Sequence, residues 1–419
     1  MSIDPTEPET IDWRDKSLWT VDRPRPVAEF AAEWHGLFDG TVSWPALVLR
    51  EPVLRANIET MAAYTARHRM LFAPHGKTSM APELFRMQLE AGAWGITVAT
   101  PHQAMVALRA GVPRVLIAHE VLDGVALRKL LAVRDEAAAE LYCFVDSPEG
   151  ARAAGEAAVA AGSTPLRMLL DVGFPGGRTG VRTVAQALEV AETVARTLGA
   201  VLVGTACYEG GLQTVEEVAG FFGTLREITE ALVAAGLLGA GAEGGGMLVS
   251  AGGSAFFDLV VSELAGEWAE RMGASIVLRS GAYVTHDDGM YAERTPFTRV
   301  ADEGGLGAAL ELWAQVVSVP EPGLVLAGMG KRDAPIDEGL PVPKLLRRTG
   351  SDLAVPLVAE CFRLNDQHAF VRLPEGLEVR PGDLVCFGIS HPCTAFDKWR
   401  SLPLVDARDR IVDVFRTYF

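Results

Sequence analysis

The chain has 419 residues, of which 49% are hydrophobic and 22% are charged, and its formal net charge is −16. This length and composition suit a globular protein with a large core, such as a barrel joined to a smaller domain. The negative charge argues against nucleic acid or an anionic membrane as a partner.

We expect neither a membrane-spanning helix nor a secretory signal in this sequence. No apolar run approaches the ~20 residues of a membrane helix, and residues 1–19 are acidic and contain proline, unlike a secretory signal. Five scattered cysteines argue against a disulfide framework. We therefore expect a cytoplasmic protein.

In chain order, short apolar runs alternate with longer helical patterns, such as 82–91, 103–110 and 215–238. Eight repeats of this alternation favour a (β/α)8 TIM barrel, although an open doubly wound sheet would show the same alternation of strands and helices. The strand-like runs are 70–74, 95–100, 115–120, 141–146, 166–172, 202–208, 247–251 and 275–279.

The pattern changes after residue 283, where proline- and glycine-rich turns separate short strand-like runs. These predict a C-terminal all-β domain, which the strand-like run 44–49 could join. The expected division is an N-terminal segment (1–44) that could pack with the β domain, a barrel (45–300) and the β domain (301–419). The β-domain runs are 312–319, 324–328, 355–360, 369–373, 384–389 and 411–415.

Barrels carry their reactive groups at the C-terminal ends of the strands. Lys77 follows the first strand, and a lysine amine that is buried or surrounded by cations becomes a nucleophile for an aldehyde. Arg178 follows the fifth strand and could pair with a phenolate or a carboxylate. Tyr208 follows the sixth and could donate to a ring nitrogen or pack on a ring. The alternatives are a solvated lysine and two structural polar residues.

Glycine-containing loops follow the seventh and eighth strands, where many barrels bind phosphate. Backbone N–H groups can approach an anion closely there, although such glycines also make plain turns. The loop residues are Gly252, Gly253 and Ser254, then Gly281, Ala282 and Tyr283.

In the β domain, His391 and Cys393 flank Pro392. In an extended chain their side chains point to the same side, and an imidazole with a thiolate suits zinc. Two protein ligands leave positions for water or substrate, as in a catalytic site. The alternative is an unpaired histidine with a free cysteine. His368 could be a further polar group nearby, or a structural histidine.

These motifs resemble a known family. Segments 74–78, 95–100 and 177–180 resemble the alanine-racemase-type barrel of the fold-type III pyridoxal-phosphate enzymes. Segments 250–254, 278–283 and 391–394 resemble the D-serine dehydratase and D-threonine aldolase branch. The resemblance covers nearly the whole chain from about Trp44 and implies a homodimer with the β domain of one subunit near the barrel of the other.

The resemblance also implies roles. Lys77 would hold pyridoxal 5'-phosphate and act as the catalytic base, Arg178 would contact its phenolic oxygen, and Tyr208 would lie by the ring. Arg279 is a second candidate for the pyridine end. The loop residues Gly252, Gly253, Ser254, Gly281, Ala282 and Tyr283 would surround the phosphate, and His391 and Cys393 would bind Zn²⁺ or another divalent metal.

The resemblance separates two reactions by the metal pair. Dehydratases of this branch carry histidine with cysteine, whereas aldolases tend to carry histidine with aspartate. Cys393 therefore predicts a dehydratase of β-hydroxy D-amino acids, D-serine-like, that releases a 2-oxo acid and ammonia. D-threonine-aldolase-type cleavage, racemisation and a non-catalytic cofactor-binding protein are the alternatives. Departures from the family pattern at 79–80, 367 and 395–399 leave the substrate open.

Overall fold

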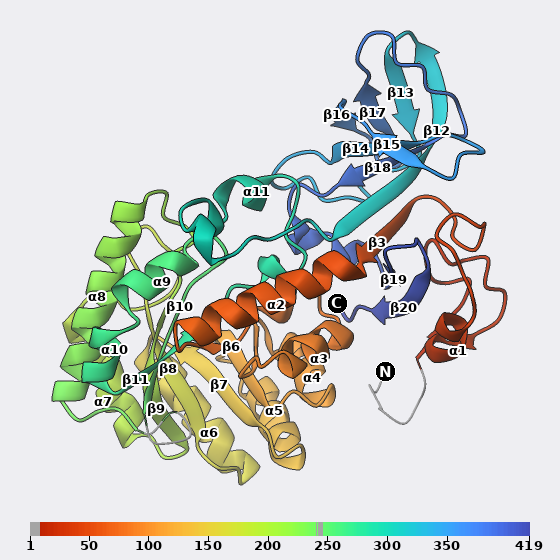
Figure 1. The fold of residues 1–419 in the computed structure, drawn as a ribbon. Helices are drawn as coiled ribbons and strands as arrows, with labels where there is room; N and C mark the ends of the chain where they lie inside the picture. The colour runs from red at the N-terminus through yellow and green to blue at the C-terminus, as the bar shows by residue number, and fades with distance from the viewer. Residues whose placement is uncertain (1–8, 240, 242–245) are drawn as a thin grey trace.

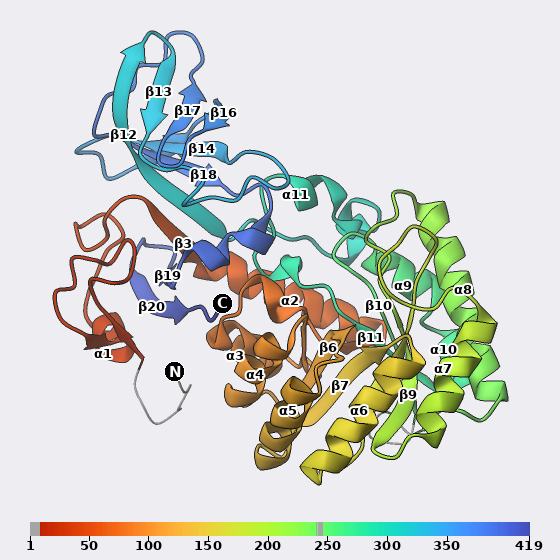
Figure 2. The same ribbon diagram turned by 180° about the vertical axis from the view of Figure 1, so that it is seen from behind.

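The computed structural model describes residues 9–239, 241 and 246–419. A barrel of parallel strands surrounded by helices stands beside a mostly antiparallel β domain (Figures 1 and 2). Helix α2 (Glu51–Arg67) leads from the β domain into the barrel.

Eight parallel strands form the barrel, in the order β4-β11-β10-β9-β8-β7-β6-β5. A bridge between His75 and Thr97 joins the chain after the first strand to the second and closes the ring. The predicted (β/α)8 barrel is therefore confirmed. The strands are β4 (Leu71–Phe72), β5 (Ile96–Val98), β6 (Arg114–Glu120), β7 (Glu140–Val145), β8 (Leu166–Val172), β9 (Ala200–Cys207), β10 (Met247–Ala251) and β11 (Ala274–Leu278).

Helices follow the strands and cover the barrel (Figure 1). The longest, α8, is capped by Thr214, whose hydroxyl accepts from the Glu217 backbone while the Glu217 side chain accepts from the Thr214 backbone. Its buried stripe includes Phe222, Leu225 and Ile228. The barrel helices are α3 (Pro82–Glu90), α4 (Pro101–Arg109), α5 (Gly124–Glu136), α6 (Pro148–Ala161), α7 (Val184–Arg196), α8 (Val215–Ala234), α9 (Phe257–Glu263) and α10 (Glu267–Met272).

The β domain is built on strands in the order β15-β14-β18-β12-β13-β17-β16, with β19, β20 and β3 attached. As the 44–49 run suggested, β3 joins this domain, pairing antiparallel with β12 and parallel with β19. The strands are β3 (Ala46–Arg50), β12 (Leu310–Glu321), β13 (Leu324–Ala327), β14 (Val342–Arg347), β15 (Ala354–Pro356), β16 (Glu360–Leu364), β17 (Ala369–Arg372), β18 (Leu384–Gly388), β19 (Ser401–Val405) and β20 (Ile411–Arg416).

Strand prediction in the β domain was incomplete. The runs 342–347 and 401–405 form strands that the sequence did not predict, and each contains a proline, Pro343 or Pro403. Proline lowers the expectation of a strand because it cannot donate to a ladder. The predicted run 355–360 is instead divided between β15 and β16.

The N-terminal segment packs on the β domain. Its buried side chains, among them Ile11, Leu18 and Phe30, share an apolar cluster with Val48 and Trp313. Its elements are β1 (Thr10–Ile11), β2 (Arg25–Pro26) and α1 (Val27–Ala32), and α1 lies beside β20 (Figure 1).

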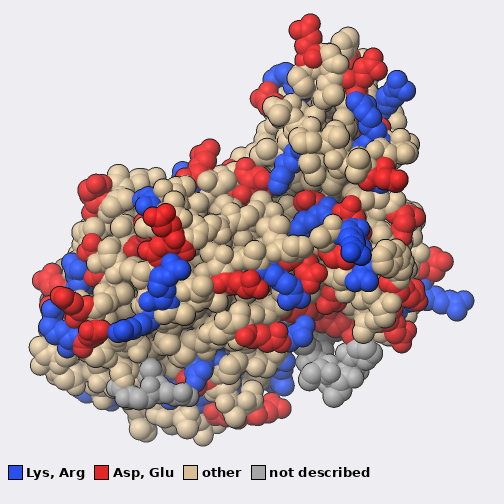
Figure 3. All heavy atoms as spheres, viewed as in Figure 1, with Lys and Arg blue, Asp and Glu red and all other residues tan. Residues whose placement is uncertain are grey.

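Further short helices lie in the barrel, in the β domain and in the segment between β11 and β12. They are η1 (Gly76–Thr78), η2 (Ala282–Val284), α11 (Met290–Arg294), η3 (Pro296–Thr298), η4 (Ala301–Glu303), η5 (Pro392–Thr394) and η6 (Phe396–Lys398). Within the described ranges, no helix has both the length and the apolarity needed to cross a membrane. Acidic and basic side chains are interspersed over the face shown in Figure 3.

Candidate active site

Lys77 lies on η1, immediately after β4, and its side chain is exposed at the barrel mouth. η1 packs against η5 of the β domain, which brings the Thr78 hydroxyl to 3.5 Å from the Cys393 sulfur. The predicted lysine segment and the predicted metal segment are therefore neighbours within one chain.

The two predicted phosphate loops are also neighbours. The Ala282 backbone N–H donates to Ser254 Oγ (3.3 Å), and Ser280 Oγ donates to the Gly253 carbonyl (3.0 Å). A Cβ on Gly281 would lie 2.4 Å from the His75 carbonyl oxygen, so glycine allows this loop to pack against the lysine segment.

Glu209 is a site residue that the sequence reading missed. Its fully buried carboxylate accepts from the backbone N–H of Gly253 (2.5 Å) and of Gly252 (3.4 Å). These two donors are thus engaged by a side chain that directly follows Tyr208, and this adjacency was the available signal. Ser254 and the residues after β11 remain as candidates for an anion contact.

Tyr283 presents its side chain to the helices. Its phenol is buried, accepts from Gln88 Nε2 on α3 (2.9 Å) and packs against Phe72 of β4. Any contact of Tyr283 with a phosphate would therefore come from its backbone.

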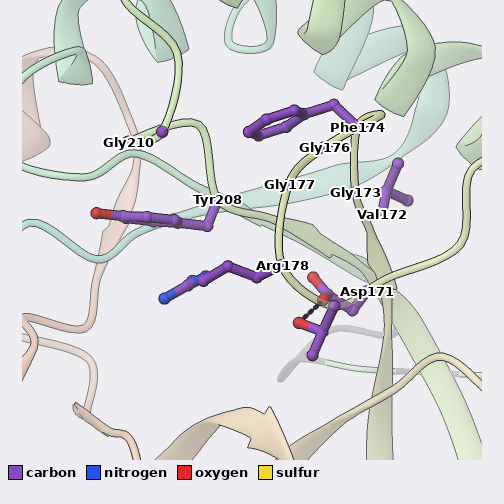
Figure 4. A pocket seen from close by; sticks show the side chains of 11 residues that line it. Asp171, Val172, Gly173, Phe174, Gly176, Gly177, Arg178, Tyr208 and Gly210 are labelled. Carbon is purple, nitrogen blue, oxygen red and sulfur yellow. Dashed lines mark hydrogen bonds between the residues drawn. The ribbon is translucent and has the colours of Figure 1, made fainter.

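Arg178 and Tyr208 lie together. The Arg178 guanidinium is 4.2 Å from the centroid of the Tyr208 ring, and Figure 4 shows the two side chains running alongside each other. A cation over an aromatic face is favourable. The loops carrying both residues line a cavity of about 300 Å³, walled also by Phe174 and glycines. Burial, with the nearby charge of Glu209, raises the pKa of Tyr208.

Arg279 occupies the barrel interior. It is buried, and its guanidinium donates to Ser250 Oγ (2.6 Å) and to the Cys207 carbonyl (2.5 Å). Burial lowers the pKa of Arg279. Burial, reinforced by the charges of Lys77 and Arg279, lowers the pKa of His75 well below its ordinary value. This histidine is therefore neutral beside the lysine.

Two carboxyl groups meet at the ends of β6 and β8. The Glu120 side chain is 6% exposed, and burial with the charge of Asp171 raises the pKa of Glu120 to about 8. Burial also raises the pKa of Asp171, whose carboxylate accepts from Thr179 Oγ1 (2.8 Å). Two such groups titrate as a pair, so one proton is retained near neutral pH.

The predicted metal pair lies at the junction of the two domains. His391 is 8% exposed, and its Nδ1 is a buried nitrogen without a hydrogen-bond partner among the described residues. The carboxylate of Asp337 lies 3.9 Å from His391 Nε2. Burial raises the pKa of the Cys393 thiol, an effect opposed by the Thr78 hydrogen bond. In the described ranges, no group of three or more His, Cys, Asp or Glu side chains is arranged to hold a metal ion.

Asp337 and Asp287 are further acidic residues near this pair that the sequence did not single out. Asp337 Oδ1 accepts from Thr394 Oγ1 (3.1 Å). Asp287 Oδ1 accepts three backbone N–H groups, those of Gly289, Tyr291 and Ala292. By contrast, His368 lies in the exposed turn between β16 and β17.

Two family models match the chain. The model described as "Alanine racemase, N-terminal domain" matches residues 52–255, and the model described as "Putative serine dehydratase domain" matches residues 309–405. The chain is 27% identical to the D-threonine aldolase of Arthrobacter sp. over 381 residues, which are 89% of this chain and 91% of the relative. It is 24% identical to a 3-hydroxy-D-aspartate aldolase of Paracoccus denitrificans (strain Pd 1222) over 314 residues, 73% and 76% of the two chains.

Solved structures share the fold. The D-threonine aldolase from Filomicrobium marinum superimposes with a TM-score of 0.74 at 24% identity, covering 90% of this chain and 95% of that one. The D-threo-3-hydroxyaspartate dehydratase from Delftia sp. HT23 gives a TM-score of 0.69 at 22% identity, covering 90% and 98%. With both domains matched in order on this barrel, the chain belongs to the fold-type III pyridoxal-phosphate enzymes of the alanine-racemase type.

Proposed function

We propose that this protein is a pyridoxal-phosphate- and metal-dependent lyase that dehydrates β-hydroxy D-amino acids to a 2-oxo acid and ammonia. The observation that carries the proposal is the 3.5 Å contact between Thr78 and Cys393. It joins the segment of Lys77, where the α-proton would be removed, to the metal pair, where the β-hydroxyl would leave.

The residues at the mouth fit the cofactor. Lys77 would hold it, Arg178 would pair with its phenolic oxygen, and Arg279, whose guanidinium lies in the barrel interior, is a second candidate for the pyridine end. Ser254 and Gly281 would contact the phosphate through a hydroxyl and a backbone N–H group. When bound, pyridoxal phosphate withdraws electrons from the α-carbon of an amino acid.

The metal pair fits a divalent ion of the zinc type. An imidazole and a thiol are its preferred donors, and the buried Nδ1 of His391 has no hydrogen-bond partner among the described residues. Such an ion polarises a hydroxyl oxygen as a Lewis acid. Because only two protein ligands are assigned, coordination positions would remain for water and substrate.

The barrel side chains and the β-domain side chains then take different parts in the reaction. The Lys77 amine takes the α-proton as a general base, and the lowered pKa of His75 makes the neighbouring imidazole a weak proton acceptor. The β-hydroxyl departs with its bonding electrons on the side of His391 and Cys393. Tyr208 and Arg178 lie alongside each other on the loops after β9 and β8 (Figure 4). Water then hydrolyses the released enamine to the 2-oxo acid and ammonia.

An aldolase is the second candidate, favoured by the similarity to D-threonine aldolases in sequence and fold. It would use the same residues to remove the hydroxyl proton and break the Cα–Cβ bond. The His-x-Cys spacing supports dehydration. Two structures that share this fold are variants of a D-threo-3-hydroxyaspartate dehydratase. In one a histidine is changed to alanine, and in the other, a metal-free form, a cysteine two positions later is changed to alanine.

The test is product analysis with cofactor-saturated protein on D-serine, D-threonine and D-threo-3-hydroxyaspartate, with and without a strong chelator. A 2-oxo acid and ammonia in equal amounts, lost with chelator and restored by zinc, is the expected result. Glycine with an aldehyde would instead establish the aldolase. No product from any of the three would overturn the proposed class of substrate. We also expect a homodimer, which sedimentation analysis would check.

A further inference from the structure

Arg178 sits on a loop that is closed at its base. The loop leaves β8 at Val172 and returns at Val181, where the two residues form a parallel bridge. Backbone hydrogen bonds from Gly173 N–H to the Val181 carbonyl and from Val181 N–H to the Asp171 carbonyl, each 2.9 Å, complete the closure. The Arg178 side chain extends from this loop toward Tyr208 (Figure 4).

A second arginine, Arg182, fills the inside of the loop. Its guanidinium donates to the carbonyl oxygens of four consecutive residues, 177–180. The contact with the Arg178 carbonyl is 2.8 Å through Nη2, and the contact with the Thr179 carbonyl is 2.8 Å through Nη1. The backbone of Arg178 is thus held by a fixed cation four residues away.

The glycines of the loop make room for this arrangement. A Cβ on Gly173 would lie 2.0 Å from Arg182 Nη1 and 2.2 Å from the Thr179 carbonyl oxygen. Gly180 has a φ of +95°, a conformation that glycine adopts without strain. A side chain at Gly173 would displace the guanidinium or the Thr179 carbonyl, and a Cβ at Gly180 would lie 2.6 Å from the backbone nitrogen of Gly173.

Two carboxylates hold the outside of the same loop. Asp171 accepts from Thr179 Oγ1 (2.8 Å), and Asp146 accepts from the Gly180 N–H (3.0 Å). These contacts fix the returning arm of the loop. Of these three side chains, Asp171 and Asp146 bind Thr179 and Gly180, whereas Arg182 donates to the backbone of Arg178 itself, so its removal should release Arg178 most directly.

We infer that Arg182 is a positioning residue for Arg178, setting the place of the Arg178 guanidinium at the cofactor. The inference rests on the proposed function, because it takes Arg178 to contact the phenolic oxygen of the cofactor. The planar fork of an arginine can serve several carbonyls at once, whereas a lysine ammonium is a single point charge on a flexible stem. Arg182→Lys should therefore fail to replace it.

The experiment compares cofactor affinity and the pH dependence of the cofactor absorption band in five proteins. These are the wild type, Arg182→Gln, Arg178→Gln, the double variant and the matched control Arg196→Gln, an exposed arginine paired only within α7. We expect Arg182→Gln to weaken cofactor binding roughly 10-fold, as removal of an outer partner of a ligand-binding group typically does. It should also shift the absorption titration, while Arg196→Gln changes neither.

The double variant isolates the route of the effect. If Arg182 acts through Arg178, then adding Arg182→Gln to Arg178→Gln changes affinity little, because the interaction is already lost. Equal effects of Arg182→Gln in both backgrounds, or no effect in either, would overturn the inference. Should Arg182→Gln fold poorly, Arg182→Ala with added guanidinium ion serves instead. Recovery of affinity supports the inference, and no recovery in a folded variant counts against it.

The outcome is separable from that of the proposed function. A wild type that binds the cofactor but converts no β-hydroxy D-amino acid would defeat the proposed function and leave the coupling of Arg182 to Arg178 measurable. A wild type that is active, with Arg182→Gln indistinguishable from Arg196→Gln, would defeat this inference alone.

Discussion

The two halves of the candidate site are built differently. On the barrel side, Arg279 is buried and donates to two fixed acceptors, and the loop of Arg178 is held by backbone bridges, two carboxylates and a second arginine. On the β-domain side, Cys393 contacts the Thr78 hydroxyl, and His391 Nε2 faces Asp337, whose side chain is 41% exposed.

This difference indicates how each half gains its order. The barrel half is preformed by the chain, so a cofactor would meet donors already in place, at little reorganisation cost. The β-domain half leaves a buried imidazole nitrogen without a partner, so its geometry should depend on a bound ion. Variants on the barrel side should therefore lose cofactor binding, whereas variants on the β-domain side should lose metal binding.

The largest effect is expected at Lys77. In the proposed mechanism Lys77 both holds the cofactor and acts as the base, so Lys77→Ala should lower turnover by about 10⁴-fold or more. The absorption band of the covalently held cofactor should also disappear. Lys129→Ala, at an exposed lysine on α5, is the control and should change neither quantity. Retention of the band in Lys77→Ala would assign the cofactor to another lysine.

The next effect is expected at the metal pair. Cys393→Ala or His391→Ala should lower turnover by roughly 100-fold, since Lewis-acid assistance contributes several kcal/mol to the transition state. Zinc content should fall while the cofactor band stays. Cys361→Ala, at a buried cysteine in β16, controls for the general loss of a thiol. A full zinc complement in both metal-pair variants would contradict the assignment.

The sequence predicted the barrel strands and the residues at their ends well. Barrel strands such as 166–172 and 247–251 have the predicted bounds, because buried parallel strands are continuous apolar runs. Lys77, Arg178 and Tyr208 stand at strand ends, where barrels carry their reactive groups, so residue order alone was enough to place them at the mouth.

The contacts of loop side chains could not be read in that way. Arg182, Glu209 and Asp337 act through backbone groups or neighbours whose positions depend on loop conformation. The phenol of Tyr283, for example, accepts from Gln88 on α3, a direction that the sequence did not indicate. Strand ends locate a residue without saying which way it points.

A third, smaller effect concerns pH and the barrel half. The pKa of Glu120 is raised to about 8, so the folded protein retains a proton that the unfolded chain has released above pH 4.5. Stability should therefore decrease as pH rises from about 5 to 8. Glu120→Gln removes this dependence. Between pH 5 and pH 8.5, the free energy of unfolding of the wild type should therefore fall by about 1–2 kcal/mol more than that of Glu120→Gln.

Urea unfolding of both proteins across this pH range measures the difference. Glu189→Gln, an exposed carboxyl on α7, should follow the wild-type profile. If Glu120→Gln also follows it, Glu120 is ionised throughout the range, and the barrel half holds no shared proton.

The smallest effect is expected at Asp337, and it measures how open the β-domain half is. Asp337 lies 3.9 Å from His391 Nε2, is half-exposed and accepts from Thr394. A carboxylate in this position would favour a cation at His391, but solvent screens it, so Asp337→Asn should weaken zinc binding by less than roughly 10-fold. Cofactor affinity should be unchanged, and Asp352→Asn, on the exposed turn before β15, is the control. A loss as large as that of Cys393→Ala would mean that Asp337 is itself a metal ligand. The β-domain half would then have three protein ligands, and its dependence on substrate to complete the coordination would be correspondingly smaller.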